Sequence, residues 1–267
     1  MRLTTLNPSK YKRFFAFGCS YTNYVWPTWA DIIGQDIPIY LNWGNPGAGN
    51  HFIFNSIVEA DARYNFNKDD LVIVMWTYKE REDRYNNSMW MHDTTRTQEK
   101  TYGAQWFKKF GDDLRGFLIR DLGYIAGIQE TIKKSNWEQF CVGPLVNVDR
   151  NMLFNTDADK FSNEYLRSLW ISIFDKLCEN KEIDLYAEEK NVLEVYKNVF
   201  LNINKSLTGR WSYEYTISRE LKDNDLHPTP LEALSFIDSV WPNNLLSANA
   251  RAHATQWAVQ RDNVTRL

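Results

Sequence analysis

Cysteine is scarce in this chain, which has only Cys19, Cys141 and Cys178 among its 267 residues. The three are odd in number and widely spaced, so the sequence predicts neither a disulfide framework nor a zinc site. The amino terminus also lacks the apolar segment of a signal peptide. Both absences favour a soluble protein made in a reducing cytoplasm, which could act elsewhere if it were carried on a particle.

A net positive charge and long apolar runs are absent as well. The net charge is −3, so no basic surface is expected and nucleic acid is not a predicted partner. No apolar run approaches the roughly 20 residues of a membrane span, so no membrane contact is predicted either. The chain contains no Gly-x-Gly-x-x-Gly fingerprint and no phosphate-loop lysine. We therefore expect no cofactor and no metal.

Aromatic residues, by contrast, are abundant. They make up 15% of the chain and include 11 Trp and 14 Tyr. Because 43% of the residues are hydrophobic, the chain can bury a sizeable core, and some of its large rings should still lie near the surface. Surface rings favour contact with carbohydrate or protein, and extra packing within the core explains them equally well.

Strand-like and helical segments alternate along the chain. Four short apolar runs are predicted to be buried strands: residues 13–17, 37–43, 71–76 and 140–142 with its flanks. Helical spacing follows Pro27, which suits a first turn, and also follows Asn50, which suits an N-cap. A longer helical face covers residues 114–132. This alternation indicates β-α-β units and a parallel sheet covered on both faces.

The last predicted helix has a clear start. Thr229 suits its N-cap, Pro230 its first position and Glu232 its third, which is the capping-box arrangement. We expect one domain over residues 1–242, with insertions around 77–107 and 145–221 packed on the sheet. A polar tail follows over residues 243–267, with a short helix around 248–259 that docks on the domain or on a partner.

Ser20 is the leading candidate nucleophile. It follows the apolar run at Phe14–Phe17 and Gly18, so its hydroxyl should lie at a strand-to-helix turn whose backbone N–H groups can face an oxyanion. A hydroxyl is a weak nucleophile without an adjacent base, and His227, just before the last helix, can take its proton. Cys19 is a weaker candidate nucleophile than Ser20, because its side chain should point away from the side of the turn on which Ser20 lies.

A glycine-rich segment follows the second predicted strand. Gly44, Gly47 and Gly49 would let backbone N–H groups approach a ligand closely, and a tight turn before a helix is the plainer explanation. Together with the serine turn and the histidine, this segment resembles the motifs of the SGNH (GDSL-type) hydrolase superfamily.

The resemblance covers residues 14–230 and keeps the family's chain order. Three blocks carry it: Gly18-Cys19-Ser20-Tyr21-Thr22 for Gly-Asp-Ser-x-Thr, Asn42-x-Gly44-x-x-Gly47 for the glycine block, and Asp225-Leu226-His227-Pro228 for Asp-x-x-His. It implies a flavodoxin-like three-layer α/β/α sandwich with a central parallel sheet. It also implies a serine esterase in which Ser20 attacks an ester, His227 carries the proton and Asp225 orients His227.

The chain departs from the family pattern at the third block, Gly-x-Asn-Asp. Trp76 and Thr77 stand there, with Arg81 nearby, as in a divergent and often phage-encoded branch of the superfamily. The N–H groups of Ser20 and Gly47 would then hold the oxyanion, with Thr77 or Asn50 in place of the family's Asn.

Two further departures are smaller. Cys19 replaces the Asp of the first block, which is not one of the family's catalytic groups. The acidic residue stands two positions before the histidine, not three, so Asp223 and Asn224 remain alternatives to Asp225.

Substrate contacts are expected from Tyr21, Trp76 and Arg81. The segment from 77 to 107 should add an aromatic and basic rim, drawn from Arg81, Arg84, Tyr85, Trp90, His92 and Trp106. Small acyl esters are the expected substrates, with O-acetyl groups on a polysaccharide favoured by that rim. The alternatives are a non-catalytic binding or virion-associated structural protein and an O-acyltransferase. The chain could also form a homo-oligomer or join a virion assembly.

Overall fold

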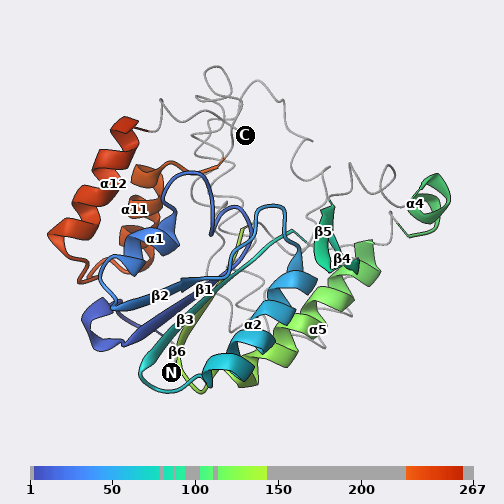
Figure 1. Ribbon diagram of the computed structural model, residues 1–267, viewed down its shortest axis with the longest axis horizontal. Helices are drawn as coiled ribbons and strands as arrows, with labels where there is room; N and C mark the ends of the chain where they lie inside the picture. The colour runs from blue at the N-terminus through green and yellow to red at the C-terminus, as the bar shows by residue number, and fades with distance from the viewer. Residues whose placement is uncertain are drawn as a thin grey trace, which may run out of the picture.

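The sheet predicted from the alternating pattern is present at the centre of the computed structural model, which describes residues 3–78, 81–86, 88–93, 103–110, 114–142 and 227–260. Its strands are β1 (Arg13–Phe17), β2 (Ile39–Asn42), β3 (Asp70–Trp76) and β6 (Asn136–Cys141). They lie in the order β2-β1-β3-β6, and every neighbouring pair is parallel (Figure 1).

Helices cover both faces of this sheet (Figure 1). One face carries α2 (Asn50–Tyr64) and α5 (Leu114–Ile132), and the other carries α1 (Trp29–Gly34), α11 (Pro230–Val240) and α12 (Ala248–Gln260). The predicted flavodoxin-like three-layer α/β/α fold is therefore confirmed. None of the helices in the described ranges is long and apolar enough to cross a membrane.

The unbroken apolar run at β1 follows from its central place in the sheet. Phe15 and Phe17 point to the α2 and α5 side, while Phe14 and Ala16 point to the side of α1, α11 and α12, and all four are fully buried. A strand with helices on both faces needs apolar residues at every position instead of alternate ones.

The boundaries of three elements differ from the predicted ones. Strand β6 begins at Asn136 and not near residue 140, because Glu138 and Gln139 are buried within it although they are polar. Helix α1 has Thr28 as its N-cap, with a capping box closed by Asp31, so Pro27 lies before the helix and not in its first turn. Strand β2 is shorter than the predicted 37–43.

The segment from 77 to 107 contains regular structure of its own. An antiparallel hairpin pairs β4 (Glu82–Asn86) with β5 (Met89–Asp93), and α4 (Ala104–Phe110) follows. The chain begins with the short 3₁₀ helix η1 (Pro8–Lys10). The predicted insertion at 145–221 lies outside the described residues. In the tail, α12 has the predicted position, and Arg251 on it pairs with Asp238 on α11.

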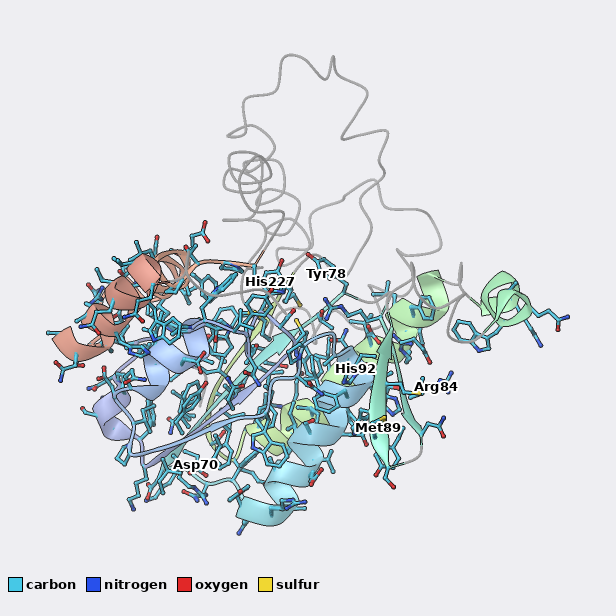
Figure 2. The ribbon with its side chains drawn as sticks, turned by 45° about the horizontal axis from the view of Figure 1, so that its top comes forward. Asp70, Tyr78, Arg84, Met89, His92 and His227 are labelled. Atoms are coloured by element: carbon cyan, nitrogen blue, oxygen red, sulfur yellow. The ribbon has the colours of Figure 1, made fainter. Side chains whose placement is uncertain are left out.

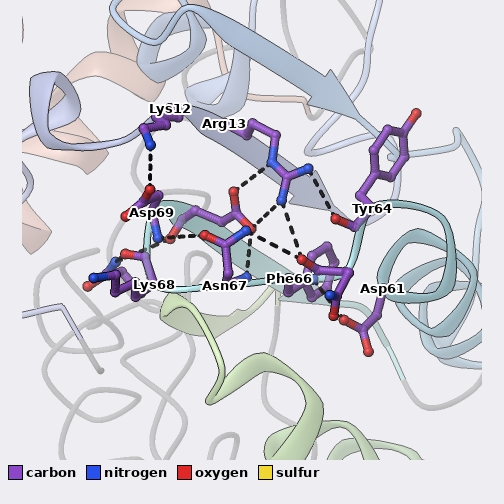
Figure 3. A network of polar contacts seen from close by, with 11 residues as sticks. Lys12, Arg13, Asp61, Tyr64, Phe66, Asn67, Lys68 and Asp69 are labelled. Atoms are coloured by element: carbon purple, nitrogen blue, oxygen red, sulfur yellow. Dashed lines mark hydrogen bonds and ion pairs between the residues drawn. The ribbon is translucent and has the colours of Figure 1, made fainter.

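An ion pair fixes the edge of the sheet where the strands begin (Figure 3). Arg13 on β1 donates to both carboxylate oxygens of Asp70 on β3, at 2.7 and 2.8 Å, and also to the carbonyl of Tyr64 at the end of α2. The Asp70 carboxylate accepts a third bond, from the N–H of Asn67. Because the Asp70 side chain is fully buried, it depends on these partners for its stability as a charge.

Asp70→Ala should therefore lower the free energy of unfolding by roughly 3 kcal/mol, because it leaves the Arg13 guanidinium without its carboxylate partner. Urea unfolding of the purified variant measures this loss. Asp69→Ala is the matched control, since the Asp69 side chain pairs with Lys12 in solvent and should change stability little. Equal midpoints for the two variants would contradict the structural role given to Asp70.

The opposite edge of the sheet is the place for a ligand. The chain leaves β1 to one side for β2 and returns on the other side for β3, so a crevice opens at the carboxyl ends of β1 and β3. Figure 2 shows Tyr78, which follows β3, and His227 at this edge, and Asp70 at the other.

Candidate active site

Ser20 lies in a tight turn at the carboxyl end of β1. The N–H groups of Thr22 and Asn23 both donate to the carbonyl of Cys19, at 2.9 and 3.1 Å, which bends the chain directly around Ser20. Ser20 is 6% exposed, whereas Cys19 is fully buried among the apolar side chains under α1 and α11. The turn therefore presents Ser20 and not Cys19, as the sequence predicts.

His227 is held directly before α11. The capping box of that helix is formed as predicted, with Thr229 Oγ1 accepting from the N–H of Glu232 and the Glu232 carboxylate accepting from the N–H of Thr229. The indole N–H of Trp26 donates to the carbonyl of Pro228 at 2.7 Å. The imidazole ring stacks on Tyr24, with ring centres 3.9 Å apart and planes at 17°.

Ser20 and His227 line the same pocket, although they stand at opposite ends of the domain sequence. The pocket is open to solvent, and its other walls are mostly apolar or aromatic: Tyr21, Tyr24, Trp26, Thr28, Trp29, Pro228, Ala233 and Phe236. Tyr21, a predicted substrate contact, has its ring centre 5.1 Å from that of His227. The structure thus unites three predicted site residues.

Ser20 and His227 share the pocket without a hydrogen bond between them in the described part of the chain. A hydrogen bond from the Ser20 hydroxyl to a His227 ring nitrogen is not among the contacts of the described residues, and such bonds often tighten only when substrate binds. The predicted orienting residue Asp225 and its alternatives Asp223 and Asn224 lie outside the described residues.

The glycine-rich loop after β2 is tied to the serine turn by backbone and amide hydrogen bonds. The N–H of Asn45 donates to the carbonyl of Gly18 at 3.1 Å, and the Asn23 side chain donates to the carbonyl of Gly44 at 2.8 Å. Within this loop Gly47 has φ +83°, a backbone conformation that favours glycine. The loop is therefore placed beside the serine turn, where the resemblance puts its oxyanion donor.

Asn50 was predicted as a helix N-cap and as an oxyanion donor, and it has neither role. The N-cap of α2 is Gly49, and the Asn50 amide instead brackets the backbone of Thr77, donating to its carbonyl at 3.0 Å and accepting from its N–H at 2.8 Å. Its second N–H donates to Asp121 at 2.7 Å. With both N–H groups used and the residue fully buried, Asn50 supports the end of β3 and has no donor left for an oxyanion.

One predicted substrate contact is corrected, and another has a partner within the protein. Trp76 is fully buried on the α2 and α5 side of the sheet, and its indole N–H donates to Gln139. Arg81 donates to the carbonyl of Ala48 at 2.8 Å, so it binds the glycine-rich loop. Thr77 remains a candidate donor, because its buried hydroxyl has no hydrogen-bond partner within the described part of the chain.

The hairpin contains residues that sequence reasoning placed differently or missed. His92, predicted as part of a surface rim, has a 10% exposed side chain and binds the buried carboxylate of Asp83, which was not predicted. The two residues face each other in the register of β4 and β5, a hairpin that was not predicted from the sequence. Of the other rim residues, Tyr85 is 64% exposed and contacts Trp90.

Comparison with known proteins found no matching family model and no matching curated protein. In the ranges that the structure describes, no three His, Cys, Asp or Glu side chains gather where they could hold a metal ion. The case for a function therefore rests on the pocket shared by Ser20 and His227 and on the loops around it.

Asp121 is a buried acid behind the end of β3. Burial raises its pKa to about 7, although Arg120 and Asn50, which both donate to its carboxylate, act in the opposite direction. Arg120 also binds Glu82 and the carbonyl of Arg81, so it joins α5 to the hairpin. This cluster supports Thr77 from the side away from solvent.

The raised pKa of Asp121 predicts a pH-dependent stability. The folded chain binds the Asp121 proton more tightly than the unfolded chain does. The contribution of this proton to the free energy of unfolding is therefore complete below about pH 4 and is lost as the pH rises to about 7. The slope is at most about 1.4 kcal/mol per pH unit. Urea unfolding from pH 4.5 to 7.5 should therefore shift the stability difference between wild type and Asp121→Asn in favour of the variant.

A suitable control for this titration is Asp238→Asn. A hydrogen bond from Arg251 lowers the pKa of Asp238, so its titration lies below the tested range and the difference should stay constant. A constant difference for Asp121→Asn as well would show that Asp121 does not titrate there.

Proposed function

We propose that this protein is a serine esterase of the SGNH type that hydrolyses small acyl esters. One observation carries the proposal: the serine at the end of β1 and the histidine before α11 line a single pocket at the carboxyl edge of the sheet. A nucleophile and a base on separate elements must share such a site if the hydroxyl is to be activated.

The reaction would proceed through an acyl-serine. Ser20 Oγ attacks the ester carbonyl and loses its proton to His227, and the oxyanion faces the N–H groups of Ser20 and Gly47 with the Thr77 hydroxyl as a third donor. His227 then gives the proton to the departing alcohol. Water attacks the acyl-serine and gives a proton to His227, which returns it to Ser20 Oγ as the carboxylic acid leaves.

The pocket favours a short, uncharged acyl group. Its lining is mainly apolar rings, with Trp29 and Phe236 among them, and the described residues that line it include no charged side chain that would pair with a charged acyl group. Acetyl is the acyl group that we propose, and O-acetyl groups on a polysaccharide are the favoured substrates because flat rings also suit sugars. The exposed Tyr85 beside Trp90 offers such rings on the hairpin.

A second candidate is a binding or virion-associated protein that has kept this fold without its chemistry. The observation in its favour is the buried and fully bonded Asn50 amide, which leaves the oxyanion site without a side-chain amide donor. A missing donor of this kind costs roughly 3 kcal/mol of transition-state stabilisation. A third candidate, an O-acyltransferase, would use the same acyl-serine with a sugar hydroxyl in place of water.

The deciding experiment measures acetate release and covalent labelling together. Purified protein is incubated with a chromogenic acetate ester and with acetylated glycans, and separately with a fluorophosphonate that labels activated serines. Acetate release, with the label on the peptide that contains Ser20, would support the esterase. Faster release with an added sugar acceptor would favour the transferase. Absence of both signals, with glycan binding retained, would support the binding protein instead.

A further inference from the structure

A chain of three polar side chains runs from the hairpin to the glycine-rich loop. Asp83 on β4 and His92 on β5 face each other, with His92 Nδ1 2.7 Å from Asp83 Oδ1. On the other side of the ring, His92 Nε2 is 3.0 Å from the side-chain nitrogen of Asn45. The Asp83 and His92 side chains are 1% and 10% exposed, so water competes little for these bonds.

Asp83 is also the cap of α2. Its two carboxylate oxygens accept from the N–H groups of Gly49 and Phe52, each at 2.8 Å. A carboxylate is favoured at this position because the amino end of a helix carries partial positive charge. A Cβ on Gly49 would lie 2.7 Å from Asp83 Oδ2, so only glycine allows this approach. Asp83 is thus fixed as a hydrogen-bond acceptor.

Because the Asp83 carboxylate accepts hydrogen bonds, it determines which ring nitrogen of neutral His92 carries the hydrogen. Nδ1 must donate to the Asp83 carboxylate, so in the neutral ring Nε2 is left as an acceptor for the Asn45 amide N–H. Because Asn45 occupies Nε2, His92 has no nitrogen available to take a proton from a substrate. The three residues form a structural relay and not a second catalytic dyad.

The relay holds both ends of the loop that contains Gly47. Asn45 lies before Gly47, Gly49 lies after it, and the guanidinium of Arg81 holds the carbonyl of Ala48 at 2.8 Å. A Cβ placed on Gly47 would meet His92 Cβ at 3.4 Å, so the histidine also packs directly behind this turn. Figure 2 shows His92 on the side of the hairpin that faces the sheet, away from Arg84 and Met89.

We propose that Asp83, His92 and Asn45 are positioning residues that fix the Gly47 turn so that its N–H can bind an oxyanion. This inference rests on the proposed function for the role of Gly47, and on the hydrogen bonds alone for the fixing of the loop. A buried chain of hydrogen bonds can hold a loop in one geometry, and a displacement of about 1 Å at a reacting centre can cost about 10²-fold in rate.

The test compares His92→Phe with Met89→Ala, a change at the exposed turn end of the same hairpin. His92→Phe keeps a ring behind Gly47 but removes both hydrogen bonds. It should lower kcat for a chromogenic acetate ester about 10²-fold and change KM less than about twofold, while Met89→Ala changes neither. A fall in the unfolding temperature with kcat unchanged would overturn the positioning role.

A second measurement does not depend on activity. The N–H of Ala48 donates to the carbonyl of Asn45 at 3.0 Å, and its hydrogen exchange should become at least about tenfold faster in His92→Phe and stay unchanged in Met89→Ala. Unchanged exchange would overturn the relay whether or not the protein is an esterase. Faster exchange in a protein whose wild type releases no acetate would keep the relay and reject the esterase.

Asn45→Ala keeps the proposal testable if His92→Phe does not fold. It removes only the last bond of the relay and leaves the Asp83 cap of α2 intact. The same fall in kcat and the same faster exchange are expected, to a smaller degree. Wild-type values for both quantities would show that the chain of bonds ends at His92 and does not position the loop.

Discussion

Replacing Ser20 with alanine is expected to lower kcat for acetate-ester hydrolysis by about 10⁴-fold or more. The loss should be this large because an acyl-enzyme cannot form without the hydroxyl, and the remaining oxyanion donors act only on attack by water. The fold should survive this change, because Ser20→Ala removes a single oxygen atom at the surface of a pocket. Initial rates over a range of ester concentrations give kcat and KM.

Ser56→Ala is the matched control for this variant. Ser56 on α2 is 5% exposed and Ser20 is 6% exposed, so both changes remove a buried hydroxyl, but Ser56 lies away from the pocket. We expect wild-type kcat for Ser56→Ala and similar urea midpoints for both variants. If Ser20→Ala kept more than a tenth of wild-type activity, the hydrolysis would come from another group and the esterase proposal would fail.

The fold was predictable where a single segment carries its own signal. The apolar run at Phe14–Phe17 can be buried only as a central strand, and the capping box at Thr229 and Glu232 marks a helix start by local chemistry. Strand β6 was only partly predicted. Its Gln139 is polar but buried, and its side-chain oxygen accepts from Trp76, a partner 63 residues away. Periodicity cannot anticipate a polar core residue whose partner is distant in sequence.

The site residues were likewise predictable where the signal is local and not where it depends on partners distant in sequence. Ser20 and His227 follow from a strand end and a helix start, and their chain order suggests that they meet. Asn50 was predicted to act on a ligand, whereas the structure turns its amide toward Thr77, because the N–H groups at the start of α2 are capped by Asp83 from the hairpin. An amide can serve either purpose, and only the fold shows which groups lie within its reach.

The aromatic residues around His227 help to fix its place at the edge of the pocket. Tyr24 stacks on the imidazole, and Trp26 holds the carbonyl of Pro228, the next residue along the chain. Thr229 then caps α11, so the backbone that directly follows the ring is held in place. Stacking limits the ring to one plane, which is part of what an orienting carboxylate does in a catalytic triad.

His227→Gln should therefore lower kcat by at least about 10³-fold, because glutamine can occupy the same space but cannot accept and return a proton. The loss should be larger for an acetylated sugar than for a chromogenic phenyl acetate. His227 deprotonates Ser20 in both reactions, but only a poor leaving group such as a sugar alkoxide also needs the proton returned. The ratio of the two losses, from parallel kinetics, is the decisive measurement. His253→Gln on α12 is the control and should leave both rates unchanged.

The double variant tests whether Ser20 and His227 act as one unit. If His227 works only by activating Ser20, then Ser20→Ala with His227→Gln should be no slower than Ser20→Ala alone, because residues of one catalytic unit are strongly non-additive. Fully additive losses would mean that the two side chains contribute independently. The shared pocket would then bind an ester without the acyl-serine step, and the nucleophile would have to be water activated by His227.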